Sequence, residues 1–386
     1  MNLVYLDNNA TTQPAPEVVE AMMPFLKDLW GNPSSVHYFG GQVQRHINLA
    51  REQVASLLGA EPSEIIFTSC GTESNNMAIY GAAEVAGPKT RLVTSRVEHP
   101  AVLSPCRHFQ EHGHQEVEIG VDSLGRLDLN ELRAVLSQGP AIVSVMWANN
   151  ETGVIFPIRE IARMVKEAGG VMHTDAVQAV GKVPVNVRDV PVDMLSFSGH
   201  KLHAPKGIGA IYVRRGTKLK PFMLGGHQEN SRRAGTPNVP YIVGLGKACE
   251  LAAAHMQEEG TRVAALRDKL ERALLETCAD TRVNGDRVHR LPNTLNMSFQ
   301  YIEGESILQK LSDQGVAASS GSACASGSLE PSHVIRAMGV PFTAAHGSIR
   351  FSLSRYNTEP EIDFVIDKMP PIVEWLRTLS PFVPTV

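Results

Sequence analysis

Short apolar segments that alternate with longer segments of helical spacing constrain the fold of this chain more than any other feature. Segments with the character of buried strands lie at residues 64–69, 91–95, 116–120, 141–149, 171–176, 194–199 and 209–213. Apolar residues at helical spacing occupy residues 16–29, 43–59, 74–86 and 158–170. Buried strands separated by helices predict a mostly parallel sheet that helices cover on both faces.

The pattern changes after the last of these strands, and we expect the sheet to end near residue 215. A long helical pattern begins at Val239 and continues to about Cys278, which is longer than most globular helices, so we expect it to join two domains. Beyond it, shorter segments predict a smaller α+β domain, and the fold class is α/β. The expected boundaries are 15–255 for the large domain, and 1–14 together with 256–386 for the small domain.

Composition places the chain among ordinary globular proteins. Its 386 residues are 43% hydrophobic and 20% charged, and its formal net charge is −4. This mildly acidic balance argues against nucleic acid or an anionic membrane surface as a partner. No window has the apolar length of a membrane span, and the segment MNLVYLDNNATT lacks the pattern of a signal peptide. We therefore expect a soluble protein of the cytoplasm.

Cysteine usage fits a reducing compartment, because the five cysteines include no CxxC pair that would indicate a disulfide framework or a zinc site. They are Cys70, Cys106, Cys249, Cys278 and Cys324. His200 and His203 lie close in sequence, but no carboxylate or thiol accompanies them, so we expect no metal site. Cys324 lies in ASSGSACASGS, residues 318–328, which has no large apolar side chain. That segment suits either a plain flexible loop or an exposed reactive thiol, and alone it does not decide between them.

Two charged residues follow successive predicted strands. Asp175 lies in VMHTDA, and Lys201 follows MLSFSG, 26 residues later. Ligands of open α/β sheets bind in the crevice at the carboxyl ends of the strands. An amine and a carboxylate in that crevice suit pyridoxal phosphate, whose aldehyde binds a lysine and whose pyridine nitrogen pairs with an acid. From spacing alone, a structural ion pair between Asp175 and Lys201 stays an open alternative.

Other polar residues follow neighbouring strands. Gly71 and Thr72 begin a predicted helix whose first N–H groups suit an anion such as a phosphate, although they also suit a plain helix cap. His99 follows RLVTS, where it can stack on a ring, move protons or be a satisfied polar residue. Asn150 follows AIVSVMWAN, where its amide can bond a ring oxygen or a substrate carboxylate.

Motifs throughout the chain resemble one family. They run in order from YLDNNATT at residues 5–12 to RFSLSRYNT at residues 350–358, and include GNPSS, TESNN, EHPAV, NNETG, HTDAVQAVGK, SFSGHK, PKGIGA, RRAGT, EGES and SSGSACASGSLEPSHV. In these motifs the chain resembles the cysteine desulfurases of the NifS/IscS type, in the class V aminotransferase group of pyridoxal-phosphate enzymes of fold type I. The details TSCGTES, VMWANNETG and SRRAGT are closer to the nitrogen-fixation (NifS) branch than to the housekeeping one.

The resemblance implies a role for each candidate residue. Lys201 matches the lysine that forms a Schiff base with the cofactor, and Asp175 matches the partner of the pyridine nitrogen. Cys324 matches the catalytic cysteine of a mobile loop at about 320–331. His99 is expected to stack on the ring and to handle protons at the thiol. The other cofactor contacts implied are Gln178 and Asn150 at the phenolic oxygen, and Gly71, Thr72, Ser198 and His200 at the phosphate.

Further residues match positions for the substrate and for a second subunit. Arg350 in SIRFSLS matches the arginine that binds the substrate carboxylate; Asn150 is a further expected substrate contact, and Asn32 in GNPSS is a weaker one. Thr236 in RRAGT resembles a residue that reaches the phosphate of the other subunit, which implies a homodimer. Cys70 departs from the pattern, because many relatives have a small residue without a thiol there.

The function implied by the resemblance is conversion of L-cysteine to L-alanine, with the sulfur held as a persulfide on Cys324. The implied acceptor is a protein such as a scaffold for iron–sulfur clusters, particularly one that supplies nitrogenase. A selenocysteine lyase-like enzyme on the same scaffold and a non-catalytic sulfur carrier stay as alternatives. We also expect that the longer tail with which some relatives bind a scaffold is reduced or absent after LSPFVPTV.

Overall fold

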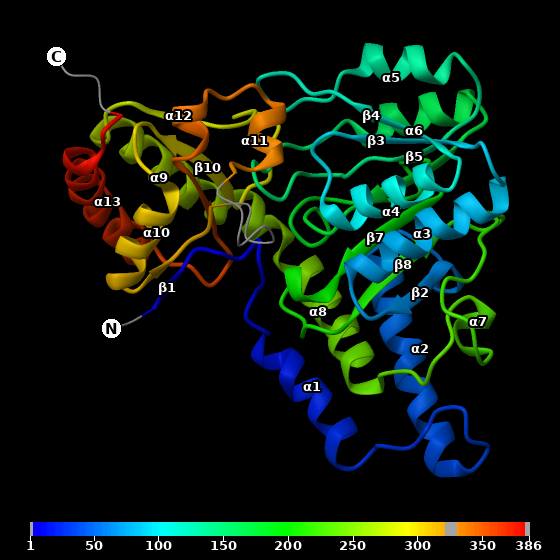
Figure 1. The fold of residues 1–386 in the computed structure, drawn as a ribbon. Helices are drawn as coiled ribbons and strands as arrows, with labels where there is room; N and C mark the ends of the chain where they lie inside the picture. The colour runs from blue at the N-terminus through cyan, green and yellow to red at the C-terminus, as the bar shows by residue number, and fades with distance from the viewer. Residues whose placement is uncertain (1–2, 321–329, 383–386) are drawn as a thin grey trace.

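The structure is a computed structural model that describes residues 3–320 and 330–382 of the chain. Cys324 and most of the loop predicted at about 320–331 lie outside the described residues. The described chain forms two parts that lie side by side, on the right and on the left of Figure 1. Buried hydrophobic residues form a core in each part.

The right-hand part contains the larger sheet (Figure 1). Within the described residues it has seven strands in the order β2-β8-β7-β6-β5-β3-β4. Neighbouring strands are parallel from β7 to β4, whereas β8 is antiparallel to both β2 and β7. The strands are β2 (Ile65–Thr68), β3 (Arg91–Ser95), β4 (Gln115–Ile119), β5 (Ile142–Ser144), β6 (Val171–Asp175), β7 (Met194–Ser198) and β8 (Gly209–Val213). The predicted mostly parallel sheet that ends near residue 215 is confirmed.

Helices cover both faces of this sheet, because successive side chains of a strand point to opposite sides. One face packs under α3 (Gly71–Ala86) and α4 (Pro100–Glu111) through Ile66, Leu92, Ile142, Met194 and Ile211. The next residue in each strand points to the other face and belongs to the core there. These residues are Phe67, Val93, Val143, Leu195 and Tyr212. The helices of that core include α1 (Pro16–Lys27), α2 (Tyr38–Leu58), α5 (Leu129–Leu136) and α6 (Ile158–Glu167).

The left-hand part is smaller and of α+β type, as predicted. β10 (Thr294–Phe299) lies between β12 (Ser348–Ser352) and β9 (Thr281–Val283), antiparallel to both. β1 (Val4–Tyr5) pairs in parallel with β11 (Val316–Ala317), which ties the start of the chain to this part. Its core also includes α10 (Gly304–Asp313) and α13 (Glu359–Leu379). The short helices are α7 (Gln228–Ser231), α11 (His333–Ala337) and α12 (Phe342–Ala345), and the last two contribute to the core of the larger part.

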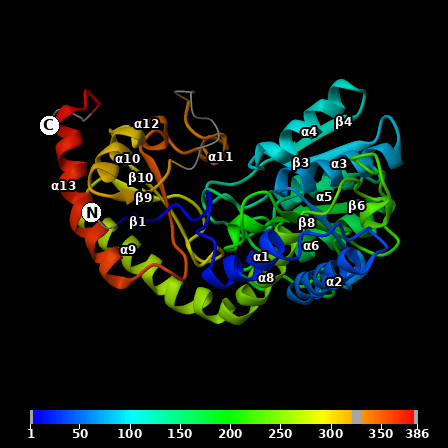
Figure 2. The same cartoon turned by 90° about the horizontal axis from the view of Figure 1, so that it is seen from below.

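A continuous helical stretch connects the two parts, as Figure 2 shows. α8 (Val239–Glu258) packs on α1 and α2, and α9 (Ala264–Thr277) packs on α13. Between them, Glu259–Val263 form a π-helical turn, a rare feature that often occurs at functional sites. The predicted helical pattern from Val239 to about Cys278 is confirmed, whereas the π turn was not predicted.

The segment at 141–149 differs from the expectation of a single strand, because the regular strand comprises only Ile142–Ser144, although Trp147 N still donates to Asp175 O of β6 (2.8 Å). Beyond it the chain turns, since Asn149 Oδ1 accepts hydrogen bonds from the N–H groups of Glu151 and Thr152 (2.9 Å each). This turn presents Asn150 at the carboxyl edge of the sheet. In the ranges that the structure describes, no helix has both the length and the apolar character of a membrane span.

Candidate active site

A cavity of about 300 Å³ lies at the carboxyl ends of the parallel strands. Its walls come from both parts of the molecule, because Arg350 of β12 and the N-terminal residues Asn9 and Ala10 line it together with the ends of the larger sheet. The predicted residues that the structure places around this one cavity are Gly71, Thr72, His99, Asn150, Asp175, Gln178, Ser198, His200, Lys201 and Arg350. Their individual roles stay predictions.

Asp175 ends β6 and is buried beside the cavity. Its Oδ2 accepts a hydrogen bond from Asn75 Nδ2 (2.6 Å), and its Oδ1 accepts one from Val177 N (2.9 Å). Burial raises the pKa of the Asp175 carboxyl, and this effect outweighs the opposite effects of the hydrogen bonds and of nearby His99 and Lys201. A cation in the cavity beside Asp175 would therefore stabilise the ionised carboxylate.

Lys201 ends a short 3-10 turn, Gly199–Lys201, directly after β7. Its Nζ donates hydrogen bonds to the backbone carbonyls of Asn9 and Ala10, the second at 2.8 Å. Carbonyl oxygens accept hydrogen bonds from either the charged or the neutral amine. The N-terminal segment thus holds Nζ at the cavity wall in both protonation states.

The beginning of α3 has the features of an anion site. Gly71 and Thr72 are its first residues, and the first N–H groups of a helix have no partner within the helix. A Cβ at Gly71 would lie 2.8 Å from Val177 Cγ2, so a glycine is needed for this close approach of helix and strand end. Ser198 Oγ is buried at the same cavity and has no hydrogen-bond partner in the described chain. These donors fit a bound phosphate.

His99 precedes α4 and accepts a hydrogen bond at Nδ1 from the N–H of Ala101 (3.1 Å). This contact leaves the proton of the neutral ring on Nε2. Burial lowers the pKa of His99, Asp175 acts against this, and Lys201 and His333 lower it further. His99 is therefore a neutral imidazole with an Nε2–H group beside the cavity.

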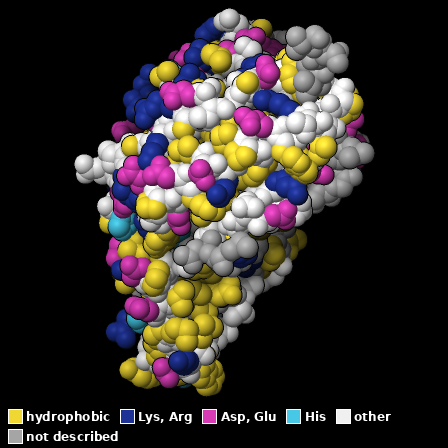
Figure 3. Space-filling view, turned by 90° about the vertical axis from the view of Figure 1, so that its left-hand side faces the viewer, with side chains coloured by type: hydrophobic (Ala, Val, Ile, Leu, Met, Phe, Trp, Pro, Cys, Tyr) yellow, Lys and Arg dark blue, Asp and Glu magenta, His cyan; other side chains and the backbone are white. Residues whose placement is uncertain are grey.

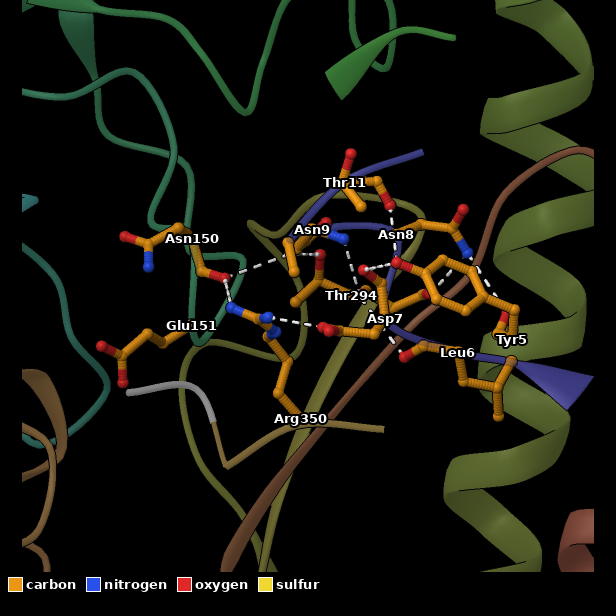
Figure 4. Close-up of polar contacts among 12 residues, drawn as sticks. Tyr5, Leu6, Asp7, Asn8, Asn9, Thr11, Asn150, Glu151, Thr294 and Arg350 are labelled. Carbon is orange, nitrogen blue, oxygen red and sulfur yellow. Dashed lines mark hydrogen bonds and ion pairs between the residues drawn. The ribbon is translucent and has the colours of Figure 1, made fainter. Parts of the chain in front are cut away.

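Arg350 is nearly fully buried, with 2% of its surface exposed. Figure 4 shows its guanidinium between Asp7 and Asn150: Nη2 pairs with Asp7 Oδ1 (2.7 Å), and Nη1 donates to Asn150 O (3.0 Å). Its Nε has no hydrogen-bond partner among the described residues. A guanidinium that is held in place and keeps a free N–H is suited to bind a carboxylate.

Gln178 and Asn150 bring amide groups to the cavity. Gln178 is buried, and its Nε2 donates to Asn9 O (3.0 Å) while its Oε1 accepts from Lys182 Nζ (2.9 Å). The Asn150 side chain points away from Arg350 in Figure 4, and only its backbone carbonyl contacts the guanidinium. Their predicted contacts with a ring oxygen stay predictions.

Two predicted residues of the described chain, Asn32 and Thr236, do not line the cavity. Asn32 is exposed, and its Oδ1 accepts a hydrogen bond from Ser34 N (2.9 Å). Thr236 is exposed in the loop before α8. Cys324 lies outside the described residues.

Sequence reasoning missed three residues that support the site: Asp7, Asn9 and Asn75. They contact Arg350, Lys201 and Asp175, respectively. Asn9 and Asn75 are both 1% exposed, although they belong to the polar runs LDNN and TESNN. The sequence signal that could have indicated these supporting residues is a run of consecutive polar residues, after a strand in LDNN and at the start of a helix in TESNN.

The remaining thiols have separate environments. Cys106, Cys249 and Cys278 are buried, and burial raises the pKa of each thiol, which makes them inert. Cys70 is half-buried at the cavity, and its Sγ accepts a hydrogen bond from Glu73 N (3.4 Å) at the start of α3. Over residues 3–320 and 330–382, no group of three or more His, Cys, Asp or Glu side chains is arranged to hold a metal ion.

The donors around the cavity fit pyridoxal phosphate. Asp175 is a buried carboxyl that a nearby cation would ionise, and the start of α3 together with the unpartnered Ser198 hydroxyl has donors that suit an anion. Lys201 supplies a primary amine between them, and His99 supplies a neutral ring. One cavity thus brings together a carboxyl for the ring nitrogen, donors for the phosphate, an amine for the aldehyde and an imidazole for the ring face. Pyridoxal phosphate requires groups of these kinds.

Comparison with known proteins gives the same family over nearly the whole chain. Residues 4–365 match the family model described as aminotransferase class-V. The chain is 58% identical over 382 residues to the cysteine desulfurase of a Nostoc species, covering 99% of this chain and 96% of that protein. It is 56% identical to the cysteine desulfurase NifS of Azotobacter vinelandii, covering 98% of this chain and 94% of the relative.

Solved structures agree with these relatives. A NifS-like protein superposes with a TM-score of 0.91 at 39% identity, covering 97% of this chain and 100% of that one. The protein SspA, solved in complex with cysteine, superposes with a TM-score of 0.81 at 34% identity, covering 92% of this chain and 100% of that one. The similarities favour a cysteine desulfurase over a selenocysteine lyase-like enzyme or a non-catalytic carrier. The chain belongs to the class-V aminotransferase family and, within it, to the cysteine desulfurases, which are pyridoxal-phosphate-dependent enzymes.

Proposed function

We propose that this cysteine desulfurase takes the sulfur of L-cysteine, releases L-alanine and keeps the sulfur as a persulfide on Cys324. The observation that carries the proposal is the placement of Lys201, Asp175 and Arg350 around one cavity. Cys324 belongs to the proposed small domain, residues 1–14 and 256–386, and Lys201 to the proposed large domain, residues 15–255.

Pyridoxal phosphate, when bound, withdraws electrons from the α-carbon of an amino acid. We assign its binding to Lys201 for the covalent bond, Asp175 for the ring nitrogen, and Gly71, Thr72, Ser198 and His200 for the phosphate. Burial lowers the pKa of His200 to about 4, so this imidazole is neutral and serves as a hydrogen-bonding group and not as a counter-charge.

Lys201 moves the α-proton of the substrate in this proposal. Its Nζ contacts the carbonyls of Asn9 and Ala10, which also stabilise the protonated amine. His99 keeps an Nε2 proton beside the same cavity and exchanges a proton with the sulfur of the substrate or of Cys324.

Arg350 binds the substrate carboxylate in this proposal. Asp7 and the Asn150 carbonyl hold the guanidinium between them and use one N–H of each Nη, so the Nε–H and the second N–H of each Nη are the donors left for the substrate. Because the guanidinium is buried, its hydrogen bonds to a carboxylate compete with little water.

The path of the chain supports Cys324 as the sulfur carrier. Arg350 N donates to Ser319 O (2.6 Å), and Ser319 N donates to Arg350 O (3.2 Å), so the chain leaves β11 beside the cavity residue Arg350. Cys324 follows five residues later, a tether of at most about 18 Å.

The chain also returns beside the cavity. Ser332 Oγ donates to Glu151 Oε2, and His333 Nε2 lies 2.9 Å from Glu98 O. Glu151 and Glu98 are the sequence neighbours of Asn150 and His99, which line the cavity. The described residues before and after the Cys324 segment, Ser319 on one side and Ser332 and His333 on the other, therefore contact residues in or next to the cavity wall.

A homodimer is part of the proposal. Five large hydrophobic residues around α1 and the start of α2 are exposed: Val19, Leu26, Trp30, Val36 and Tyr38. Figure 3 shows hydrophobic side chains gathered at the lower end of the molecule, where Figure 1 places α1. An apolar patch of this kind marks a protein interface. Thr236, exposed in its own chain, is assigned to the phosphate of the second subunit.

The biological role follows the NifS branch in this proposal. The 56% identity to a relative named NifS supports sulfur supply for nitrogen fixation. We propose a protein scaffold for iron–sulfur clusters as the sulfur acceptor, and the cytoplasm as the site of the reaction.

Two substitutions test the assigned roles. Cys324→Ala is expected to stop release of sulfide and alanine from L-cysteine while the visible absorbance of the bound cofactor is kept. Lys201→Ala is expected to lose the absorbance of the lysine-bound cofactor. Lys247→Ala, which removes a lysine on the outer side of α8 paired with Glu250, serves as the control. Alanine release at the wild-type rate by Cys324→Ala would contradict the proposed carrier.

A further inference from the structure

A second buried lysine lies behind Lys201. Lys182 is 6% exposed, and together with Lys201 it lines a small cavity of about 10 Å³ that is separate from the substrate cavity. Glu259 of the π turn lines the same small cavity. A buried amine costs stability unless its hydrogen bonds are satisfied, so the contacts of Lys182 indicate what it does.

The contacts of Lys182 lead to Gln178. Its Nζ donates to Gln178 Oε1 (2.9 Å) and to Gln178 O (3.3 Å). On the opposite side of the amide, Gln178 Nε2 donates to Asn9 O (3.0 Å), the carbonyl that also accepts from Lys201 Nζ. Lys182, Gln178, Asn9 and Lys201 thus form one buried chain of hydrogen bonds.

The direction of this chain is set by its two ends. An ammonium group only donates, and a carbonyl only accepts. Lys182 therefore requires the oxygen of the Gln178 amide on its own side, and Asn9 requires the N–H₂ group on the other. The second hydrogen of that N–H₂ group is left for the cavity that Gln178 lines.

We propose that Lys182 is a positioning residue that fixes the Gln178 amide with its N–H₂ group toward the cofactor cavity and toward the carbonyl that holds Lys201. This inference rests on the proposed function, in which Gln178 contacts the ring oxygen of the cofactor. It extends that function to a residue outside the substrate cavity.

The charges around Lys182 agree with this role. The charged and titratable groups that face it are Lys201, His200, His203, Glu259, Arg350 and Arg355. Burial above all, together with the nearby charges of Lys201 and Arg350, lowers the pKa of Lys182 to about 7, while Glu259 acts in the opposite direction. Glu259 is the one acid among these groups; burial raises its pKa, and the nearby charge of Lys182 acts in the opposite direction.

The first test uses the chain without cofactor. The exchange of the Gln178 side-chain N–H₂ hydrogens is measured by ¹⁵N NMR, and Gln178→Ala assigns the signals by their loss. In Lys182→Met the exchange is expected to be about tenfold faster, because one of the two anchors of the amide is gone. Lys247→Met is the matched control and is expected to keep the wild-type rate. A wild-type rate in folded Lys182→Met would overturn the proposal.

A rescue variant covers the case in which Lys182→Met does not fold. Lys182→Gln keeps an N–H donor in place of the ammonium, and its exchange rate is expected to stay within about threefold of the wild type. Exchange about tenfold faster than the wild type in folded Lys182→Gln would contradict positioning by a donor at this place.

The second test uses the loaded enzyme. Lys182→Met and Gln178→Ala are each expected to lower kcat/KM about tenfold, and the double variant is expected to lose no more than either single variant. Losses that multiply would show that Lys182 does not act through Gln178. If Gln178→Ala alone keeps the wild-type kcat/KM, the assigned contact of Gln178 with the cofactor is wrong, whereas the exchange measurement still decides the role of Lys182.

Discussion

At the scale of single residues, the site is marked by buried polar atoms that the protein leaves without a partner. Ser198 Oγ, Arg350 Nε and Asn75 Oδ1 are three such atoms in the described chain. An unsatisfied buried polar atom costs about 1–3 kcal/mol, so a ligand that completes the hydrogen bonds of these atoms would be stabilised in the cavity. Two of these residues have different proposed partners: Ser198 binds the phosphate of the cofactor, and Arg350 binds the carboxylate of the substrate.

The buried His173 gives a pH-dependent prediction. Its ring nitrogens lie 2.8 Å from Ser144 Oγ and 2.9 Å from Ser196 Oγ, and burial lowers its pKa to about 3. In the unfolded chain a histidine binds a proton near pH 6.5. Below about pH 6.5 the unfolded state therefore holds one more proton than the folded state at this residue, and the stability it contributes falls by about 1.4 kcal/mol per pH unit as the pH decreases.

The measurement is urea unfolding of the wild type and His173→Gln at pH 7.5 and pH 5. We expect the difference in the free energy of unfolding between the two proteins to change by about 2 kcal/mol in favour of the variant at the lower pH. A difference that does not depend on pH would show that His173 is not neutral and buried.

At the scale of elements, the approach of α3 to the ends of β6 and β7 forms the anion site. The approach depends on Gly71, because a Cβ there would lie 2.8 Å from Val177 Cγ2 and 3.4 Å from Ser198 Cβ. A side chain at this position requires either the Val177 side chain or the first turn of α3 to move, and a shift of the helix would displace the N–H groups assigned to the phosphate.

Gly71→Ala is therefore expected to weaken binding of pyridoxal phosphate about tenfold or more, because the donors of the first turn shift. Titration of the cofactor-free chain, followed by visible absorbance, measures this affinity. Gly41→Ala is the matched control: Gly41 is exposed in α2, and a Cβ there meets nothing within 4 Å. The control is expected to keep the affinity and to gain up to about 1 kcal/mol of stability from helix propensity. Equal affinities for wild type and Gly71→Ala would contradict the assigned phosphate site.

The elements also show which parts of the site were predictable. Asp175, Lys201 and His99 each follow a short apolar strand, and parallel strands of one sheet end at one edge, so their convergence followed from the pattern. Asn9 was not predictable in this way, because its contact with Lys201 joins residues 192 positions apart and leaves no local periodicity. The π turn at Glu259–Val263 was missed for a related reason, since its residues continue the helical pattern on both sides.

At the scale of the whole molecule, the substrate cavity depends on how the two parts are joined. Lys201 follows β7 of the larger sheet, Arg350 lies in β12 of the smaller one, and both line the same cavity. The N-terminal segment crosses between the parts, since β1 pairs with β11 while Asn9 and Ala10 hold Lys201. The helices α8 and α9 connect the parts a second time (Figure 2).

The proposed homodimer predicts that Thr236 of one subunit completes the cofactor site of the other subunit, and a mixed dimer can test this. If Thr236 serves the second subunit, a mixed dimer of Lys201→Ala and Thr236→Val has one complete site, formed by Lys201 of the second variant and Thr236 of the first. We expect the mixed dimer, isolated with two different tags, to bind one cofactor tightly and to release alanine from cysteine. A mixed dimer as weak as both parent variants would show that Thr236 serves its own chain.

The central claim is that sulfur from cysteine is carried on Cys324. Mass spectrometry of the peptide that contains Cys324, taken after the loaded enzyme is incubated with L-cysteine, tests it most directly. We expect one added sulfur atom on Cys324 that a reductant removes, and no such addition in Lys201→Ala. An unmodified Cys324, or a sulfur atom found instead on Cys70, which lines the same cavity, would contradict the account.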